Sequence, residues 1–470
     1  MAKRPPVSRA LLAVPALGAA LALAHAGCSS EDTTCPDGVS QKFHESEFLE
    51  VDTVWSADCG PHVITNFVRV GEGVTLTIEP GARVELAKDA SLQVGMESYA
   101  KAGSLSAKGT LERPITFTRH DAEPWTAIAV QYPSVATFEH TVIEGGGADD
   151  PMTANASLMI RGDYKLPRKD MATLAHVTIR DSVGPGLWIR ECGALTAAST
   201  DLTVTGSGKA DASDMTHFPV SVSPTALTTF PAGTYTGNAV DEILIDTEDT
   251  SLGVPDVLED VTVHERGVPY RVGMFAGGSL RFGTDDAHPQ STLTIEAGVT
   301  MRFPKGDDAA SGGAIVMTIE TDSASSELPG TTLVAKGTAD KPIVFTSAAA
   351  TPSAGDWRGL WFGLGANADN VLDHVVIEYA GSDILAGGFA CPPDHSNNGA
   401  IAIMGGPAAK AFLTNSVIRH SASAGVLRGW DLMQGAAVDF KPTNTFEDIA
   451  ECDQTVMALD QGDCPQGSCG

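Results

Sequence analysis

The string Ala107-Lys108-Gly109-Thr110, separated by three residues from Pro114-Ile115-Thr116-Phe117-Thr118, is nearly repeated further along the chain. The second copy reads Ala335-Lys336-Gly337-Thr338 and then, at identical spacing, Pro342-Ile343-Val344-Phe345-Thr346. Internal duplication of short β-rich units is typical of repeat architectures, in which one unit stacks on the next. The duplication predicts one stacked body at residues 55–450, made of two related halves at about 55–245 and 246–450.

A finer repeat of the form apolar–x–x–polar–x–apolar–apolar runs through both halves. Its apolar runs are too short for helices but long enough for strands with one buried side. Stacking such strands turn upon turn pairs all their backbone N–H and C=O groups. We therefore expect an all-β solenoid of about a dozen rungs, roughly 60 Å long at about 4.8 Å per rung. The polar positions of the repeat are His140, His176, Asp201, Asp260, His374, Asn415 and Asn444.

Several strings resemble the repeats of the pectin-lyase-like superfamily, namely LTIEPG at residues 76–81, WRGLWF at 357–362 and LDHVVIEYAG at 372–381. The chain is also similar to exported bacterial β-helix proteins that begin near a tryptophan and a VIT strand, here Trp55 and Val63-Ile64-Thr65. This resemblance implies a right-handed parallel β-helix over roughly residues 55–450. It implies no activity, because the shared residues are structural ones.

The N-terminus has the pattern of an export signal. Residues 1–9 carry three positive charges, and residues 10–24 form an apolar run of signal-peptide length, too short to span a membrane. Ala26-Gly27-Cys28 resembles the bacterial lipoprotein processing site, which implies lipidation of Cys28 and an outer-membrane or cell-surface location. Cleavage after Ala26 and plain secretion is the alternative. We expect a signal peptide at 1–27 and an acidic tether at 28–54.

Charge and cysteine content agree with export. The chain has 59 Asp and Glu against 30 Lys and Arg, a net charge of −29 that disfavours nucleic acid as a partner. The partners we expect are the membrane, through the lipid, and a polysaccharide or surface protein. Seven cysteines remain besides Cys28, an odd number that predicts disulfides and one thiol. Cys35 is expected to pair with Cys59, Cys192 to be the thiol, and residues 451–470 to form a Cys/Gly-rich tail.

The recurrent histidines have two interpretations, a metal or acid–base site and a structural ladder. Polar side chains stacked on successive rungs can satisfy turn backbone, which favours the ladder. Three acidic pairs are expected in solvated turns. The alternatives are a site for Ca²⁺, the one candidate cofactor, and a glycosidase acid and base. These pairs are Asp149-Asp150, Asp285-Asp286 and Asp307-Asp308.

Two further places are candidates for binding. Asp383, Asp394 and His395 lie in a polar insertion that forms either a ligand or ion site or a surface loop tied by Cys391. Trp357 and Trp361 form either a sugar-stacking platform or, for at least one of them, part of the core. Residues 218–246 depart from the repeat and are interpreted as a long excursion followed by the strand that starts the second copy.

No catalytic residue is assigned. Polygalacturonase-type enzymes would carry NTD, GHG and RIK segments besides a double Asp, and only the double Asp is found here. The leading hypothesis is a surface lipoprotein whose non-catalytic β-helix binds a glycan or envelope component or has a structural role. The alternatives are an extracellular polysaccharide lyase or glycoside hydrolase, and a calcium-dependent adhesion module.

Overall fold

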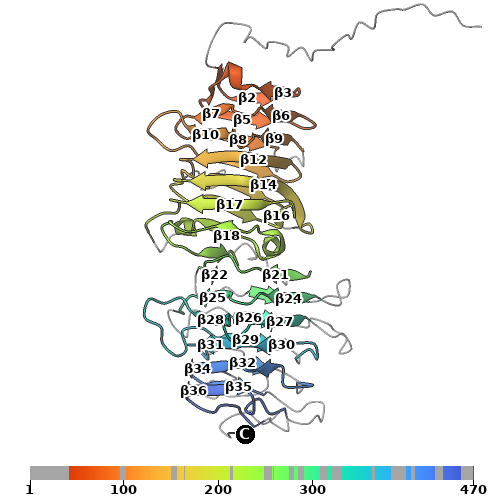
Figure 1. Cartoon of the computed structure of the whole chain (residues 1–470), viewed down its shortest axis with the longest axis vertical. Coiled ribbons are helices and arrows are strands. Elements are labelled where there is room, and N and C mark those ends of the chain that lie inside the picture. Colours follow the sequence, from red (N-terminus) through yellow and green to blue (C-terminus); the bar gives the residue numbers. More distant parts are fainter. Residues whose placement is uncertain are drawn as a thin grey trace, which may run out of the picture.

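The protein is a rod of stacked parallel strands (Figure 1). Its computed structural model describes residues 42–95, 102–149, 156–163, 165–211, 215–247, 257, 259–274, 280–283, 291–306, 316–319, 331–362, 366–382, 398–403, 408–428, 438–456 and 469. Every pairing between the strands named below is parallel, which confirms the all-β parallel β-helix.

One sheet of 14 strands runs along the whole rod, so at about 4.8 Å per strand the stack is roughly 60 Å long, as the sequence predicts. Its strands, in spatial order, are β2 (Glu47–Leu49), β5 (Phe67–Val70), β8 (Ser91–Val94), β11 (Ala127–Gln131), β13 (Leu158–Arg161), β15 (Leu187–Arg190), β18 (Val220–Val222), β20 (Ile243–Ile245), β22 (Tyr270–Val272), β25 (Thr300–Phe303), β28 (Ile343–Ser347), β31 (Val375–Glu378), β34 (Val417–Ser421) and β36 (Thr445–Ile449).

A sheet of 12 strands supplies the other two faces of the first half. Its main path is β1 (Lys42–His44), β4 (His62–Ile64), β7 (Arg83–Leu86), β10 (Ile115–Arg119), β12 (Val135–Glu144), β14 (Lys169–Arg180), β17 (Thr200–Thr205) and β19 (Gly233–Thr234). Off this path lie β3 (Thr53–Trp55), β6 (Thr75–Ile78), β9 (Ser104–Lys108) and β16 (Gly193–Leu195). The long strands β12 and β14 bend around one corner and so belong to both faces.

Two sheets of five strands complete the second half. One consists of β21 (Val261–Val263), β24 (Thr292–Ile295), β27 (Thr332–Lys336), β30 (Val371–Asp373) and β33 (Leu413–Thr414). The other consists of β23 (Leu280–Phe282), β26 (Val316–Ile319), β29 (Gly359–Phe362), β32 (Gly399–Ile403) and β35 (Ala424–Leu427). The described 3-10 turns are η1 (Ala57–Cys59), η3 (Met215–His217) and η4 (Pro224–Thr229).

The core runs along the rod axis because alternate side chains of each strand point inward. In β6, Leu76 and Ile78 are buried while Thr75 and Thr77 are half-buried on the outside. The same pattern recurs in β24, where Leu293 and Ile295 are buried. Successive rungs therefore place one aliphatic or aromatic side chain on another, and a single continuous core results.

The two copies of the duplication lie in different sheets. β10, which holds the first PIxFT string, is in the 12-stranded sheet, whereas β28, which holds the second, is in the 14-stranded sheet. In the first half the 14-stranded sheet instead contains β11, the strand after Trp125. The 14-stranded sheet thus holds a different strand of the coil in each half.

Two sequence expectations are wrong. The tether predicted at 28–54 includes β1 and β2, which already form the first rung with β3. The excursion predicted at 218–246 is part of the stack, because β18 pairs with β20 and β17 pairs with β19. The strand expected at the end of this stretch is present as β20. The other strands of the two stretches escaped notice because they have only two or three residues, too few to show a period.

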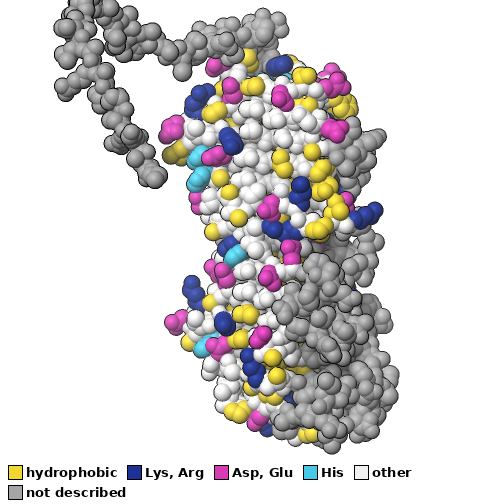
Figure 2. Space-filling model, turned by 90° about the vertical axis from the view of Figure 1, so that its right-hand side faces the viewer, with side chains coloured by type: hydrophobic (Ala, Val, Ile, Leu, Met, Phe, Trp, Pro, Cys, Tyr) yellow, Lys and Arg dark blue, Asp and Glu magenta, His cyan; other side chains and the backbone are white. Residues whose placement is uncertain are grey.

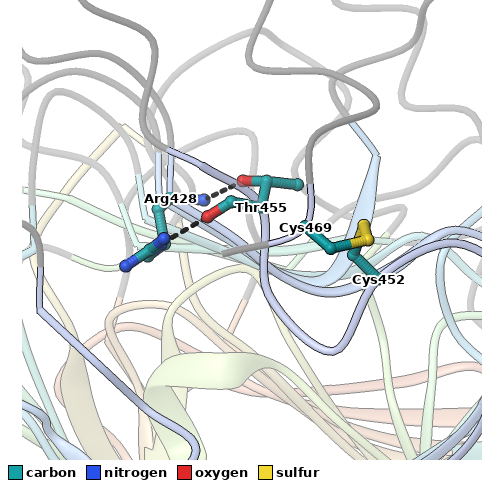
Figure 3. Close-up of a disulfide and its surroundings, with 4 residues drawn as sticks. All are labelled: Arg428, Cys452, Thr455 and Cys469. Carbon is teal, nitrogen blue, oxygen red and sulfur yellow. Dashed lines mark hydrogen bonds between the residues drawn. A yellow bond between two sulfur atoms is a disulfide. The ribbon is translucent and has the colours of Figure 1, made fainter.

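The C-terminal end of the rod is closed by a disulfide between Cys452 and Cys469, whose Cα atoms are 5.2 Å apart (Figure 3). Beside it, the backbone N–H of Arg428 donates to Thr455 Oγ1 at 3.0 Å, and its guanidinium donates to the Thr455 carbonyl. These contacts pack the start of the predicted tail, which includes the buried Cys452, against the last rungs.

The remaining described cysteines agree with the expectation as far as it is tested. Cys192 carries a reduced thiol. Cys59 is in a disulfide, while its expected partner Cys35 lies outside the described residues. Among the residues that the structure describes, no helix has the length and apolar character needed to cross a membrane.

Candidate functional site

The histidine column of the sequence repeat is a ladder at one bend of the coil. His140, His176 and Asp201 stand in register on β12, β14 and β17, each with a positive φ between 43° and 54°. The imidazole rings of His140 and His176 stack at 4.6 Å between centroids, and His176 Nδ1 lies 3.0 Å from Asp201 Oδ2. In this left-handed backbone region short polar residues are favoured, which accounts for the residue types.

The second half has the same bend at His374 and Asn415, whose φ values are 52° and 50°. Asp260 and Asn444 do not belong to this column. Asp260 Oδ1 accepts a hydrogen bond from the backbone N–H of Thr292, and Asn444 Oδ1 accepts one from Ser416. Both side chains cap the backbone of a neighbouring rung. The sequence pattern alone does not distinguish a capping residue from a residue at the bend.

A pair of equivalent clusters was not found from the sequence. Thr118 Oγ1 donates to Glu144 Oε1 at 2.8 Å, and Arg180 Nε donates to Glu144 Oε2 at 2.8 Å. In the second half Glu378 accepts from Thr346 at 2.7 Å and from Arg419 at 2.6 Å. The signal was present, since Thr and Glu occupy equal places in both copies of the duplicated strings.

The Glu144 cluster holds its carboxylate in the ionised form. Partial burial opposes ionisation, but the hydrogen bonds from Thr118 and Arg180 outweigh it and hold the pKa of Glu144 below its ordinary value. A general acid needs a raised pKa, so this environment is the reverse of what glycoside protonation requires.

Trp357 is a core residue and cannot stack on a sugar. Its side chain is 0% exposed, its ring stacks on Phe303 at 4.0 Å, and its Nε1 donates to the Glu378 carbonyl at 2.9 Å. Trp125 makes the matching bond to the Glu144 carbonyl at 3.0 Å. The sugar-stacking prediction is therefore wrong for Trp357, and the alternative that at least one of the two tryptophans packs in the core is confirmed. Trp361 is half-buried in β29.

Most of the predicted ion and anchor residues cannot be placed. Cys28, Asp383, Asp394, His395 and the acidic residues 150, 285, 286, 307 and 308 lie outside the described residues. Asp149 is described, and its carboxylate pairs with Lys209 Nζ at 2.8 Å. Within the part of the chain that is described, no group of three His, Cys, Asp or Glu side chains is arranged to hold a metal ion.

One corner of the first half gathers positive charge, although the chain as a whole is acidic. Arg161 and Arg190 stand in register on β13 and β15, and Arg168 and Lys169 lie where the chain enters β14. We call these four residues, with Lys165, the basic corner. Three carboxylates accompany them: Glu191 pairs with Arg161 at 2.8 Å, Asp170 with Arg168 at 2.7 Å, and Asp163 accepts from the Lys165 backbone.

Aromatic rings orient two cations of the basic corner. The Arg190 guanidinium lies 4.5 Å from the ring centroid of Trp188, and Lys169 Nζ lies 5.6 Å from that of Tyr132. Sequence reasoning missed this corner. Its signal was six Lys and Arg within residues 161–190 of a chain that is otherwise poor in both. Figure 2 shows one face of the rod, on which Lys and Arg side chains lie among Asp and Glu side chains.

Comparison with known proteins supports the fold. Residues 287–402 match the family model of a pectate-lyase-like beta helix domain. Neither the curated proteins nor the solved structures contain a significant match to the chain. The matched segment spans β24 to most of β32 and includes Trp357, Trp361, Asp383, Asp394 and His395. The stacked parallel strands and this match together identify the chain as a right-handed parallel β-helix repeat protein.

Proposed function

We propose that this protein is an exported lipoprotein whose rod binds a glycan or another envelope component at the cell surface without turning it over. The N-terminal charge pattern, the apolar run and Cys28 support export and anchoring. The disulfides of Cys59 and of Cys452 with Cys469 fit an oxidising compartment outside the cytoplasm.

The observation that carries a binding role over catalysis is the duplication of the Thr–Glu–Arg cluster. A catalytic constellation acts at one place, whereas the clusters of Glu144 and Glu378 recur on two different sheets. In each cluster, the glutamate carboxylate accepts hydrogen bonds from a threonine and an arginine of neighbouring rungs. Glu144 and Glu378 thus link neighbouring coils of the rod.

Anchoring is tested by replacing Cys28. The full-length precursor carrying Cys28→Ala is expected to lose incorporation of a radiolabelled lipid precursor and to leave the membrane fraction. A Cys192→Ala variant serves as the control, because it also removes one thiol. Unchanged membrane retention of the Cys28→Ala protein would contradict the lipoprotein proposal.

Binding without turnover is tested with the exported chain incubated with soluble polysaccharides, with and without Ca²⁺. We expect retarded migration in gels that contain a ligand polysaccharide and no new reducing ends or unsaturated products. Release of either product would refute the non-catalytic role.

The second candidate is a polysaccharide lyase or hydrolase, favoured by the pectate-lyase-like match at 287–402. The polar insertion with Asp383, Asp394 and His395 falls inside this segment and would be its site. Replacing Asp383 and Asp394 together by Asn should abolish product release if this candidate is right. The same double variant should leave gel retardation unchanged if the protein only binds.

A further inference from the structure

The basic corner has a local charge opposite to that of the whole molecule. Five cations stand there against three carboxylates, in a chain with a net charge of −29. An acidic protein surface repels anionic polymers. A local excess of Arg and Lys is therefore the place on this rod where such a polymer can bind. Arg161 and Arg190 lie on adjacent rungs, about 4.8 Å apart along the rod axis.

The cations of this corner are oriented before any ligand arrives. Trp188 holds the Arg190 guanidinium over its ring, and Tyr132 does the same for the Lys169 ammonium group. Arg168 is fixed at one end of its guanidinium, where Nη2 donates to Thr229 Oγ1 at 2.9 Å. Side chains fixed in this way lose less conformational entropy on binding, which raises affinity.

Two buried donors at the corner have no acceptor within the described structure. Trp188 is 8% exposed, and its Nε1 makes no hydrogen bond. Arg168 Nε is likewise buried without a partner. Buried N–H groups nearly always have a partner, and an acidic group held by the neighbouring cations would supply the acceptor that these two donors lack.

We propose that the basic corner is a binding site for a polysaccharide that carries oxyanion groups, either carboxylate or sulfate. Arg161, Arg190 and Lys169 hold successive acidic groups along the rod, and the N–H groups of Trp188 and Arg168 each donate to an acidic group. The inference rests on the proposed glycan-binding function and adds the charge of the glycan and the place where it binds.

The test measures the affinity of the full exported chain for polygalacturonate, dextran sulfate and neutral dextran. We expect binding to one or both acidic polymers, weakened by added salt, and none to dextran. Arg190→Gln should weaken binding roughly tenfold or more, because it removes a charge-assisted hydrogen bond. Trp188→Phe keeps the ring beneath Arg190, so a loss of roughly fivefold would report the indole N–H alone.

Arg113→Gln is the matched control, since Arg113 is exposed and lies in the turn before β10 rather than at the basic corner. It changes the net charge as Arg190→Gln does and is expected to leave affinity within twofold. Equal losses in the two variants, or no binding to either acidic polymer, would overturn the site. Binding to dextran alone would overturn the site while leaving glycan binding intact, and binding to none of several glycans would refute the proposed function itself. Thermal unfolding of each variant shows whether it is folded.

Discussion

His62 makes the first rungs sensitive to acid. It is 1% exposed, stacks on Trp55 at 5.1 Å, and its Nε2 donates to the Ser56 carbonyl at 3.0 Å. Burial lowers the pKa of His62 from 6.5 to about 4, against the opposing effect of that hydrogen bond. A depressed pKa means that the folded state disfavours the charged ring. The stability it contributes is present above pH 6.5 and is lost as pH falls toward 4.

The expected loss is up to about 3 kcal/mol in the free energy of opening the first rungs. Hydrogen exchange of the β1 and β4 amides, measured between pH 7 and pH 4 and corrected for intrinsic rates, would report it. Burial also lowers the pKa of the neighbouring His44, so both rings act in the same direction. His62→Gln should flatten most of the pH dependence. Protection that stays constant over this range in the native chain would refute the assignment.

Trp357 is expected to matter for stability and not for binding. Trp357→Ala removes a fully buried ring stacked on Phe303 and should cost about 3–5 kcal/mol in denaturant unfolding. Trp357→Phe keeps most of the ring but leaves the Glu378 carbonyl without its donor, at about 1–2 kcal/mol. Trp361→Ala is the comparison, and its half-buried ring should cost less. A larger loss at Trp361 would contradict this order.

At the scale of the strand, the bend between faces depends on residues that accept a positive φ. His374 and Asn415 have φ near 50° on successive rungs. We expect His374→Asn to be tolerated and His374→Val to cost about 1–3 kcal/mol, because β-branched residues are strained there. Thr137→Val is the control, since Thr137 lies in the extended part of β12. Equal effects of the two valine substitutions in denaturant unfolding would contradict the backbone explanation.

The strands themselves could be predicted because both of their signals are local. Apolar and polar residues alternate within each strand, and each duplicated string spans only a few residues. The polar positions could be predicted only in part. His140, His176, Asp201, His374 and Asn415 share one bend, whereas Asp260 and Asn444 cap backbone elsewhere. The two groups differ in backbone conformation. Asp and Asn are compatible both with the bend and with the capping position, so the residue type does not distinguish them.

At the scale of the whole molecule, the sequence shows two copies but not how their sheets connect. The connection depends on which strand of the second half pairs with β20, and the structure pairs β20 with β22. The basic corner escaped prediction for a similar reason. Lys169 and Tyr132 are far apart in sequence and meet only because successive coils stack in this register.

The junction of the halves is held by Glu242, which is 3% exposed. It accepts from Arg271 Nε at 3.0 Å and from Arg302, so one buried carboxylate joins the start of β20 to β22 and β25. Glu242→Gln would leave two partly buried guanidinium groups without their anion, at a cost of about 3–5 kcal/mol. Because this cost falls where the sheets change partners, we expect one unfolding transition in denaturant to separate into two, with new proteolytic cleavage between the halves.

Glu378→Gln is the matched control, because Glu378 is also held by an arginine but lies within the second half. It should lower stability without separating the halves, since the rungs on both sides of it belong to one copy. If Glu242→Gln unfolds in one transition like Glu378→Gln, the halves are coupled through the continuous core instead. The 14-stranded sheet would then suffice to hold the rod together across the junction of the halves.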